Sequence, residues 1–304
     1  MRNETLSNNQ MISVLILFLF GSSVAIGVNT AAEQDSWIVV IIACLFAIPL
    51  MLLYSRIIKL NPGRDFFEMS TAVLGKVFGI ILNILMILYG LHLGAIVLRD
   101  FSSFIELTSM PETPELPLIV GLLILTAYIA KCGLETLGSF SVFTLILVML
   151  IFLFTIALSF EVLDMENFYP VDHGFWFMAD KATLTTAFPF GETVLVLGIA
   201  GALRKPVRPY KVYIWGTAIG FIVLLLVVIR NTAVLGPHIM SGSNFPSYTA
   251  ACIMKAGTFL ERIESSITYN FLLAGTIKIS ICLFAATKGI AYLFGIKQYK
   301  HIVM

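Results

Sequence analysis

The tetrapeptide Pro189-Phe190-Gly191-Glu192 interrupts an apolar stretch, residues 184–203, that is long enough to cross a membrane. A membrane-spanning helix pairs its backbone donors and acceptors within itself, because hydrocarbon offers no other partner. Pro189 removes one donor and clashes with the preceding turn, and Gly191 lets the chain leave helical geometry at small cost. Glu192 adds a carboxylate that is expensive at membrane depth. These residues therefore predict a broken helix that lines a pore or binds a ligand.

The composition is typical of a membrane protein. Apolar residues make up 59% of the chain and charged residues only 12%, and the mean hydropathy is +0.95. Soluble domains are about half apolar and about a quarter charged. We expect an all-α polytopic membrane protein in which residues 1–304 form a single transmembrane domain. Its eight apolar segments, each close to the length that a span requires, are 11–30, 37–55, 79–98, 116–130, 140–160, 184–203, 211–230 and 265–287.

Lysine and arginine are distributed unevenly between alternate loops. One side of the membrane holds Arg2, Arg56, Lys59, Arg64, Lys76, Lys131, Arg204, Lys205, Arg208, Lys211, Lys288, Lys297 and Lys300. The other side holds only Arg99, Lys181, Arg230, Lys255 and Arg262. The positive-inside rule therefore predicts that the N-terminus and the C-terminal residues lie in the cytoplasm.

The sequence does not support an enzyme or a metalloprotein. No nucleophile–base arrangement or cofactor motif is present, and the cysteines and histidines lack the spacing of metal ligands. We expect no catalytic residue, no cofactor and no metal site.

Two loop segments predict short helices outside the spans. Asn61-Pro62-Gly63 has the composition of a turn and leads into an interfacial helix within residues 56–78. In the outer stretch 231–264, Phe245-Pro246-Ser247 can begin an amphipathic helix. We expect this helix to lie on the outer mouth; the alternative is a membrane-surface loop without a gating role.

The first span carries a second candidate break. Gly21, Ser22 and Ser23, followed by Gly27, lie halfway along an otherwise apolar helix. Glycine there permits close helix packing, which is common in membranes. Alternatively, the helix unwinds locally and exposes backbone groups to a ligand.

The two candidate breaks strengthen each other. Transporters built from inverted repeats carry discontinuous helices at corresponding positions of the two repeats, and spans one and six are such positions. Backbone groups at the half-helix ends can then bind a substrate carboxylate or a cation. We therefore expect a ligand between Gly21-Ser22-Ser23 and Phe188-Pro189-Phe190-Gly191-Glu192. Three roles remain open for Glu192: pairing with a basic residue or backbone amide, binding a ligand ammonium, or exchanging a proton.

The eighth span has polar residues on two faces. Ser265, Tyr269, Thr276 and Ser280 fall in one narrow stripe at about 100° per residue. The stripe either lines a cavity, which makes Tyr269 and Thr276 ligand-binding candidates, or its hydroxyls bond back to their own helix. Lys278 falls nearly opposite the stripe and lies too deep to be a boundary residue. With Glu192, it is our candidate for a coupling residue, because a fixed ammonium can replace a coupling cation or take part in proton movement.

The chain resembles the B subunits of bacterial spore germinant receptors, the endospore germination permeases of the amino acid–polyamine–organocation superfamily. The motifs that carry this resemblance are Asn8-Asn9-Gln10, Phe20-Gly21-Ser22-Ser23, Gly133-Leu134-Glu135-Thr136, Pro189-Phe190-Gly191-Glu192, Phe245-Pro246-Ser247-Tyr248 and the segment 257–264. The resemblance implies a ten-helix inverted-repeat fold in the inner membrane of the spore. It also implies a small germinant, often an amino acid, between broken helices one and six, with a membrane A-type subunit and a lipoprotein C-type subunit as partners.

The chain departs from that family pattern in length. Ten spans are expected and eight are found, so the sequence is either a fragment or a member that lacks the last two helices. The leading functional prediction is a nutrient sensor whose ligand shifts a conformational equilibrium. The alternatives are a proton-coupled secondary transporter of amino acids and a structural or assembly subunit without a ligand of its own. No feature of the sequence points to nucleic acid.

Overall fold

The computed structural model describes residues 4–28, 30–169, 171, 173–254, 263–296 and 298–303. In these residues the chain is helical, and eight helical segments are long and apolar enough to cross a membrane. This confirms the predicted polytopic all-α architecture. The eight segments are Asn8–Ile26, Thr30–Leu60, Phe66–Thr108, Glu115–Cys132, Leu134–Val162, Phe175–Ala202, Pro209–Gly242 and Glu264–Leu293.

Several helices extend well beyond the predicted apolar segments. The third predicted span, 79–98, lies inside α4 (Phe66–Thr108), which also contains the expected interfacial helix and bends at Gly75, where φ is 76°. The remaining long helices are α3 (Ser36–Leu60), α5 (Glu115–Cys132), α6 (Leu134–Ser159), α8 (Pro209–Gly242) and α10 (Glu264–Leu293). Hydropathy detects only the part of a helix that crosses the hydrocarbon of the bilayer. The backbone hydrogen bonds of the helix continue beyond this part until a helix-breaking residue ends them.

The first and sixth spans are both broken, as predicted. The first consists of α1 (Asn8–Phe20) and the short α2 (Ser23–Ile26), which ends at Gly27 with a φ of 81°. The sixth consists of α7 (Phe175–Thr185), the π-helical turn η4 (Thr186–Phe190) and the 3-10 segment η5 (Gly191–Ala202). Phe188 is extended, with φ −121° and ψ 117°. The proline that follows disfavours helical geometry at this position, which explains where the helix breaks.

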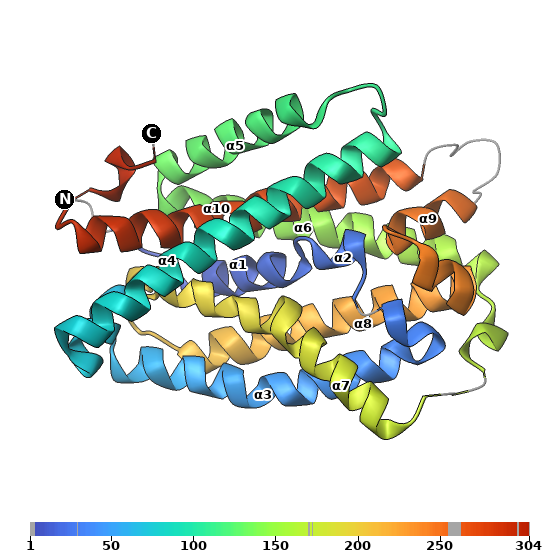
Figure 1. Ribbon diagram of the computed structural model, residues 1–304, viewed down its shortest axis with the longest axis horizontal. Coiled ribbons are helices and arrows are strands. Elements are labelled where there is room, and N and C mark those ends of the chain that lie inside the picture. The colour runs from blue at the N-terminus through green and yellow to red at the C-terminus, as the bar shows by residue number, and fades with distance from the viewer. Residues whose placement is uncertain are drawn as a thin grey trace.

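The broken first span lies in the middle of the bundle (Figure 1). α1 packs against α8, α6 and α10, and α10 packs along α4. Consistent with this position, apolar side chains of α1 from Val14 to Phe20 are almost completely buried. Large apolar side chains on the outer helices are exposed instead, among them Leu45, Leu88, Ile124 and Phe143. They form the surface that faces the hydrocarbon of the bilayer.

Both described ends of the chain lie at one end of the bundle, which we call the terminal face (Figure 1). There, Lys288 Nζ lies 2.6 Å from Asp65 Oδ2, and Lys300 Nζ lies 2.7 Å from Glu4 Oε1. The backbone N–H of Gly201 also donates to Asp65 Oδ1 at 2.7 Å. These contacts connect the N-terminal segment, the start of α4, the end of η5 and the C-terminal residues, which include η6 (Tyr299–His301).

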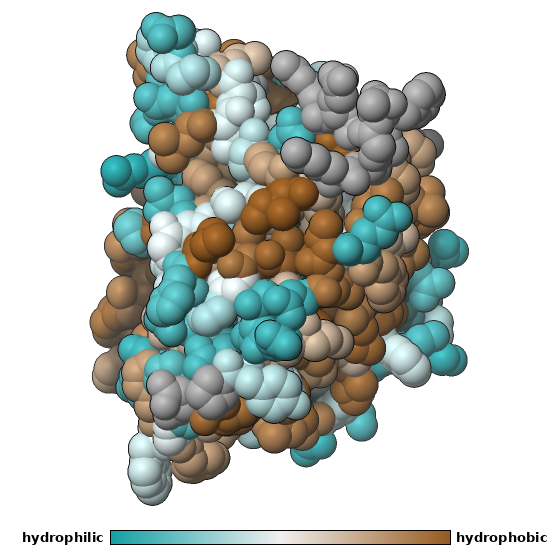
Figure 2. All heavy atoms as spheres, turned by 90° about the vertical axis from the view of Figure 1, so that its right-hand side faces the viewer, coloured by the Kyte–Doolittle hydropathy of each residue, from teal (hydrophilic) through white to brown (hydrophobic). Residues whose placement is uncertain are grey.

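The opposite face of the bundle carries α9 (Pro246–Ile253) and three short 3-10 segments, η1 (Thr30–Asp35), η2 (Phe160–Val162) and η3 (Met165–Phe168). α9 begins where Phe245-Pro246-Ser247 predicted a helix. Most of the remaining outer motif, residues 257–262, lies outside the described residues. Figure 2 looks onto this face and shows hydrophilic side chains around an apolar patch.

Candidate functional site

Lys278 joins the two helix breaks. Its Nζ atom donates hydrogen bonds to Glu192 Oε2 at 2.6 Å and to Ser22 Oγ at 3.1 Å. Ser22 lies at the break of the first span, Glu192 follows the break of the sixth, and Lys278 is in the middle of α10. The side chain of Lys278 is 0% exposed and that of Glu192 is 7% exposed. The site is therefore a buried ion pair between three segments that are distant in the sequence.

The break in the first span makes room for the lysine. A Cβ atom on Gly21 would lie 2.6 Å from Lys278 Cδ, so a larger residue does not fit there without a shift. Nζ also lies 5.3 Å from the ring centroid of Phe18 and 5.1 Å from that of Phe188. Aromatic faces attract a cation at such distances, most strongly when water is excluded. A carboxylate, a hydroxyl and two aromatic rings thus replace the water shell of the ammonium.

Neighbouring side chains support the backbone of the sixth-span break. Thr193 Oγ1 donates to the Phe190 carbonyl at 2.7 Å, and Tyr54 Oη donates to the Gly191 carbonyl at 3.4 Å. One turn earlier, Thr186 Oγ1 donates to its own helix at Ala182 and to the Ala43 carbonyl of α3. Pro189 and Phe190 are buried at the break. Glu192 is consequently held on a supported segment rather than on a free loop.

Asp100 is a charged neighbour that the sequence analysis missed. It lies on α4 and interacts electrostatically with both Lys278 and Glu192. The third span was predicted to end at residue 98, so Asp100 fell among ordinary boundary residues. α4 continues to Thr108, which places Asp100 within the helix. The only sign of this residue in the sequence was an acidic side chain two positions after the predicted end of an apolar span. With all three groups ionised, Glu192, Lys278 and Asp100 carry one excess negative charge.

The hydroxyl stripe of α10 makes local hydrogen bonds. Thr276 Oγ1 donates to the Leu272 carbonyl, and Ser280 Oγ donates to the Thr276 carbonyl, each at 2.7 Å. This is the second of the two arrangements that the sequence left open. Tyr269 is 60% exposed and therefore points away from the buried face that carries Lys278. The proposed ligand-binding roles of Tyr269 and Thr276 remain predictions.

Ser23 also bonds back to its own helix, since Ser23 Oγ donates to the Leu19 carbonyl at 2.8 Å. Within the described residues, no group of three or more His, Cys, Asp or Glu side chains is arranged to hold a metal ion. The groups that the breaks bring together are a buried carboxylate, an ammonium and hydroxyls. Such groups bind and orient charged ligands or move protons.

Residues 5–304 match the family described as "Spore germination protein", whose members are spore permeases. This match covers the two breaks, the Glu192–Lys278 pair and all eight spans. The chain belongs to this family. Membership agrees with the resemblance drawn from the sequence motifs and with the multi-pass helical fold.

Individual family members are distant but similar over most of their length. Spore germination protein KB of Bacillus subtilis (strain 168) is 29% identical over 301 residues, which are 97% of this chain and 80% of that relative. Spore germination protein YndE of the same organism is 22% identical and covers 92% of this chain, with 79% of its own length matched. Spore germination protein XB of Bacillus anthracis is 23% identical over 83% of this chain and 70% of its own length.

Proposed function

We propose that this chain is the transporter-like subunit of a spore germinant receptor and that it binds a small germinant between the breaks of spans one and six. The observation that carries the proposal is the buried Lys278–Glu192 pair, which contacts both breaks through Ser22 and Glu192. Placing an ionisable side chain inside a membrane span costs free energy, and such residues usually have a functional role. Family membership supports the role in germination.

The chemistry of the pair favours a zwitterionic α-amino acid as the germinant. Its ammonium fits the carboxylate of Glu192, and its carboxylate fits the ammonium of Lys278 with the hydroxyl of Ser22 beside it. Binding then replaces one internal ion pair by two pairs with the ligand, and no buried charge is left alone. A neutral sugar that separated the same pair would leave both charges without a counter-ion, which is strongly unfavourable.

Ligand binding at this place is also a means of signalling. Lys278 and Glu192 contact each other directly. A ligand that binds between their charged groups must therefore move α10 away from the broken segments. A ligand shifts a conformational equilibrium only by its different affinity for the two states, and the opened pair provides that difference. We propose that this change passes to a membrane A-type subunit and a lipoprotein C-type subunit.

The proposed setting is the inner membrane of the spore, with the N-terminus in the cytoplasm. The uneven distribution of lysine and arginine supports this orientation, because Arg56 and Lys59 near the end of α3, Arg204 and Lys205 before α8, and Lys288 near the end of α10 lie toward the N-terminal side. The binding site then lies between this side and the opposite face that carries α9.

A thermal-shift screen of the purified full chain against amino acids, sugars and nucleosides tests the proposal. We expect an amino acid to raise the midpoint of unfolding of the wild type but not of the charge-neutral variant E192Q/K278M. The matched control is D65N/K288M, which removes an ion pair of the same 2.6 Å length at the terminal face. It should keep the ligand-induced shift. A shift that persists in E192Q/K278M contradicts the proposed site.

A second candidate function is proton-coupled transport of an amino acid. The buried carboxylate of Glu192, in contact with the ammonium of Lys278, favours it, because buried carboxylates in transporters can take up and release protons. Uptake of labelled amino acid by proteoliposomes, driven by an imposed proton gradient, distinguishes a transporter from a sensor. A ligand-induced thermal shift without uptake supports the sensor.

A further inference from the structure

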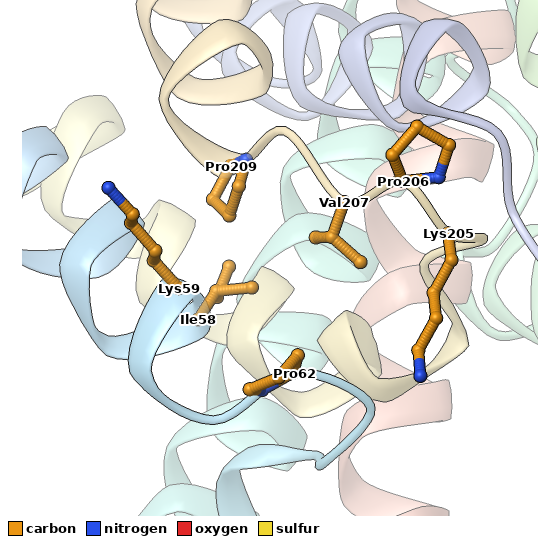
Figure 3. Close-up of a pocket in the computed structure, with 7 residues that line it drawn as sticks. All are labelled: Ile58, Lys59, Pro62, Lys205, Pro206, Val207 and Pro209. Carbon is orange, nitrogen blue, oxygen red and sulfur yellow. The ribbon is translucent and has the colours of Figure 1, made fainter.

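A groove of about 550 Å³ lies at the terminal face, away from the helix breaks. Its floor is apolar and includes Ile58 from α3, Pro62 from the following turn, and Val207 and Pro209 from the connection between η5 and α8. Lys59 and Lys205 stand on opposite sides of this floor (Figure 3). The groove thus combines an apolar surface with two cationic ends.

Hydrogen bonds to the N-terminal segment hold the η5–α8 wall of the groove. The N–H of Leu6 donates to the Ala202 carbonyl at 2.7 Å, and the N–H of Arg204 donates to the Leu6 carbonyl at 2.8 Å. Asn8 Nδ2 donates to the Pro206 carbonyl at 3.0 Å, and Asn8 Oδ1 accepts from the N–H of Arg208 at 3.1 Å. These four bonds span the whole connection, so the groove is preformed and not a gap in a loose loop.

Lys59 is also held in place. Its Nζ atom lies 5.5 Å from the ring centroid of Tyr210, the second residue of α8. This contact holds the Lys59 side chain against the start of α8, at one side of the groove.

Within the described part of the chain, the lining of the groove contains two lysines, Lys59 and Lys205, and no acidic residue. Among the residues that the structure describes, none of the exposed basic side chains near the groove forms an ion pair. These side chains are Arg56, Lys59, Arg64, Arg204, Lys205, Arg208 and Lys211. Asp65, the acidic residue closest in sequence to Pro62 of the groove, is already paired with Lys288. The positive charge is therefore available to an anionic ligand.

The groove lies at the level where the helices leave the bilayer. α3 ends at Leu60 and α8 begins at Pro209. Leu53 and Leu60 on α3 are exposed apolar residues, as is Trp215, about 9 Å along α8 from Pro209 at 1.5 Å per residue. Tryptophan is enriched at the membrane–water interface. The apolar floor is thus placed beside the headgroup region.

We propose that this groove binds an anionic phospholipid, with the headgroup phosphate between Lys59 and Lys205 and the glycerol and upper acyl carbons on the apolar floor. Basic pockets at the cytoplasmic ends of transmembrane helices recognise anionic headgroups in this way. The apolar floor favours a lipid over free phosphate, which has no apolar part to bury. The site is independent of the proposed germinant site.

Native mass spectrometry of the full chain, released from mixed micelles of phosphatidylglycerol and phosphatidylcholine, tests the proposal. The wild type should retain phosphatidylglycerol in preference to phosphatidylcholine. K59A/K205A should reduce the retained phosphatidylglycerol on the order of tenfold, because both phosphate contacts are lost. The matched control K76A/K131A removes the same charge from exposed lysines outside the groove and should retain the wild-type amount.

An equal loss in the control would show that only general surface charge attracts the lipid, and it would overturn the proposal. A second arm adds millimolar inorganic phosphate. Retained phosphatidylglycerol supports the lipid site, whereas complete displacement by phosphate alone would identify a free-phosphate site and would also overturn it. The unfolding midpoint of each variant, measured in parallel, should match the wild type, since both lysines are exposed.

Discussion

Gly21 and Lys278 are in such close contact that the glycine has no room for a side chain. A Cβ atom on Gly21 would lie 2.6 Å from Cδ and 3.1 Å from Cβ of Lys278. The terminal ammonium of the lysine is fixed by Glu192 and Ser22, so the middle of the chain cannot move aside without loosening both contacts. The position of Lys278, and with it the ion pair at the break of the sixth span, therefore requires a glycine at position 21 in the first span.

Gly21→Ala should lower the stability of the protein and displace Lys278. Overpacking of a tightly packed interior costs about 1–3 kcal/mol. We expect a lower midpoint of unfolding and a weaker amino-acid response. The control is Gly94→Ala, because a Cβ there meets Cys282 Cβ at an ordinary 3.4 Å. Equal effects of the two substitutions would show that Gly21 serves only general helix packing.

The two members of the buried ion pair should show strong thermodynamic coupling. Removing one partner leaves the other as an uncompensated buried charge, which costs about 3–5 kcal/mol. We therefore expect E192Q and K278M each to be markedly less stable than the double variant E192Q/K278M. Urea unfolding of the four proteins in a double-mutant cycle measures this coupling. Additive effects would mean that the side chains do not interact in the folded protein.

Asp35 should stabilise the connection between η1 and α7 on the face opposite the termini. Asp35 Oδ2 accepts from the N–H of His173 at 3.0 Å and lies 2.9 Å from His173 Nδ1, and the imidazole stacks on Phe177. Asp35→Asn weakens buried, charge-assisted contacts, so we expect a loss of roughly 1–3 kcal/mol and faster amide exchange around residues 173–178. Asp180→Asn is the control.

Asp180 is exposed and forms a 3.6 Å pair with the half-buried Lys181. Exposed pairs contribute only about 0–1 kcal/mol, so amide exchange in this variant should remain near that of the wild type. A result in which Asp35→Asn behaves like Asp180→Asn would contradict a structural role of the Asp35–His173 contact.

The contacts of Glu4 should make the stability of the terminal face depend on pH. Partial burial raises the pKa of Glu4, but hydrogen bonds from Lys300, Tyr299 and the N–H of Leu134 outweigh burial and hold this pKa below its usual value of 4.5. A carboxyl group whose pKa is lowered by folding stabilises the protein above its unfolded pKa. That contribution is lost as the pH falls below 4.5 and through the lowered value.

Thermal unfolding of the wild type and Glu4→Gln between pH 7 and pH 3 measures this effect. The wild type should be the more stable protein at pH 7, and the difference should shrink below about pH 4.5. Lys300→Ala removes one of the contacts that lower the pKa and should reduce the pH dependence. A constant difference across the range would mean that Glu4 does not act through its charge.

Much of the architecture followed from the sequence because its signals are local. Apolar runs identified the eight spans, and Pro189 and the glycines around Ser22 identified the breaks. Helix ends were less accurate, as α4 illustrates, because hydropathy does not report where a backbone ladder stops. Asp100 was overlooked for the same reason. The polar stripe on α10 was visible in the sequence, but only its hydrogen-bond distances revealed that Thr276 and Ser280 bond to their own helix.

By itself, the sequence determined that this protein spans the membrane, that spans one and six are broken, and that a carboxylate and an ammonium lie at membrane depth. Only the tertiary structure decided that these two groups meet. Lys278 and Glu192 are 86 residues apart, and Lys278 and Ser22 are 256 residues apart. Hydropathy and break motifs indicate which segments lie in the membrane and where their helices are interrupted. Which side chains meet across the bundle depends on how the helices pack. The close contact of Gly21 with Lys278 is part of that packing.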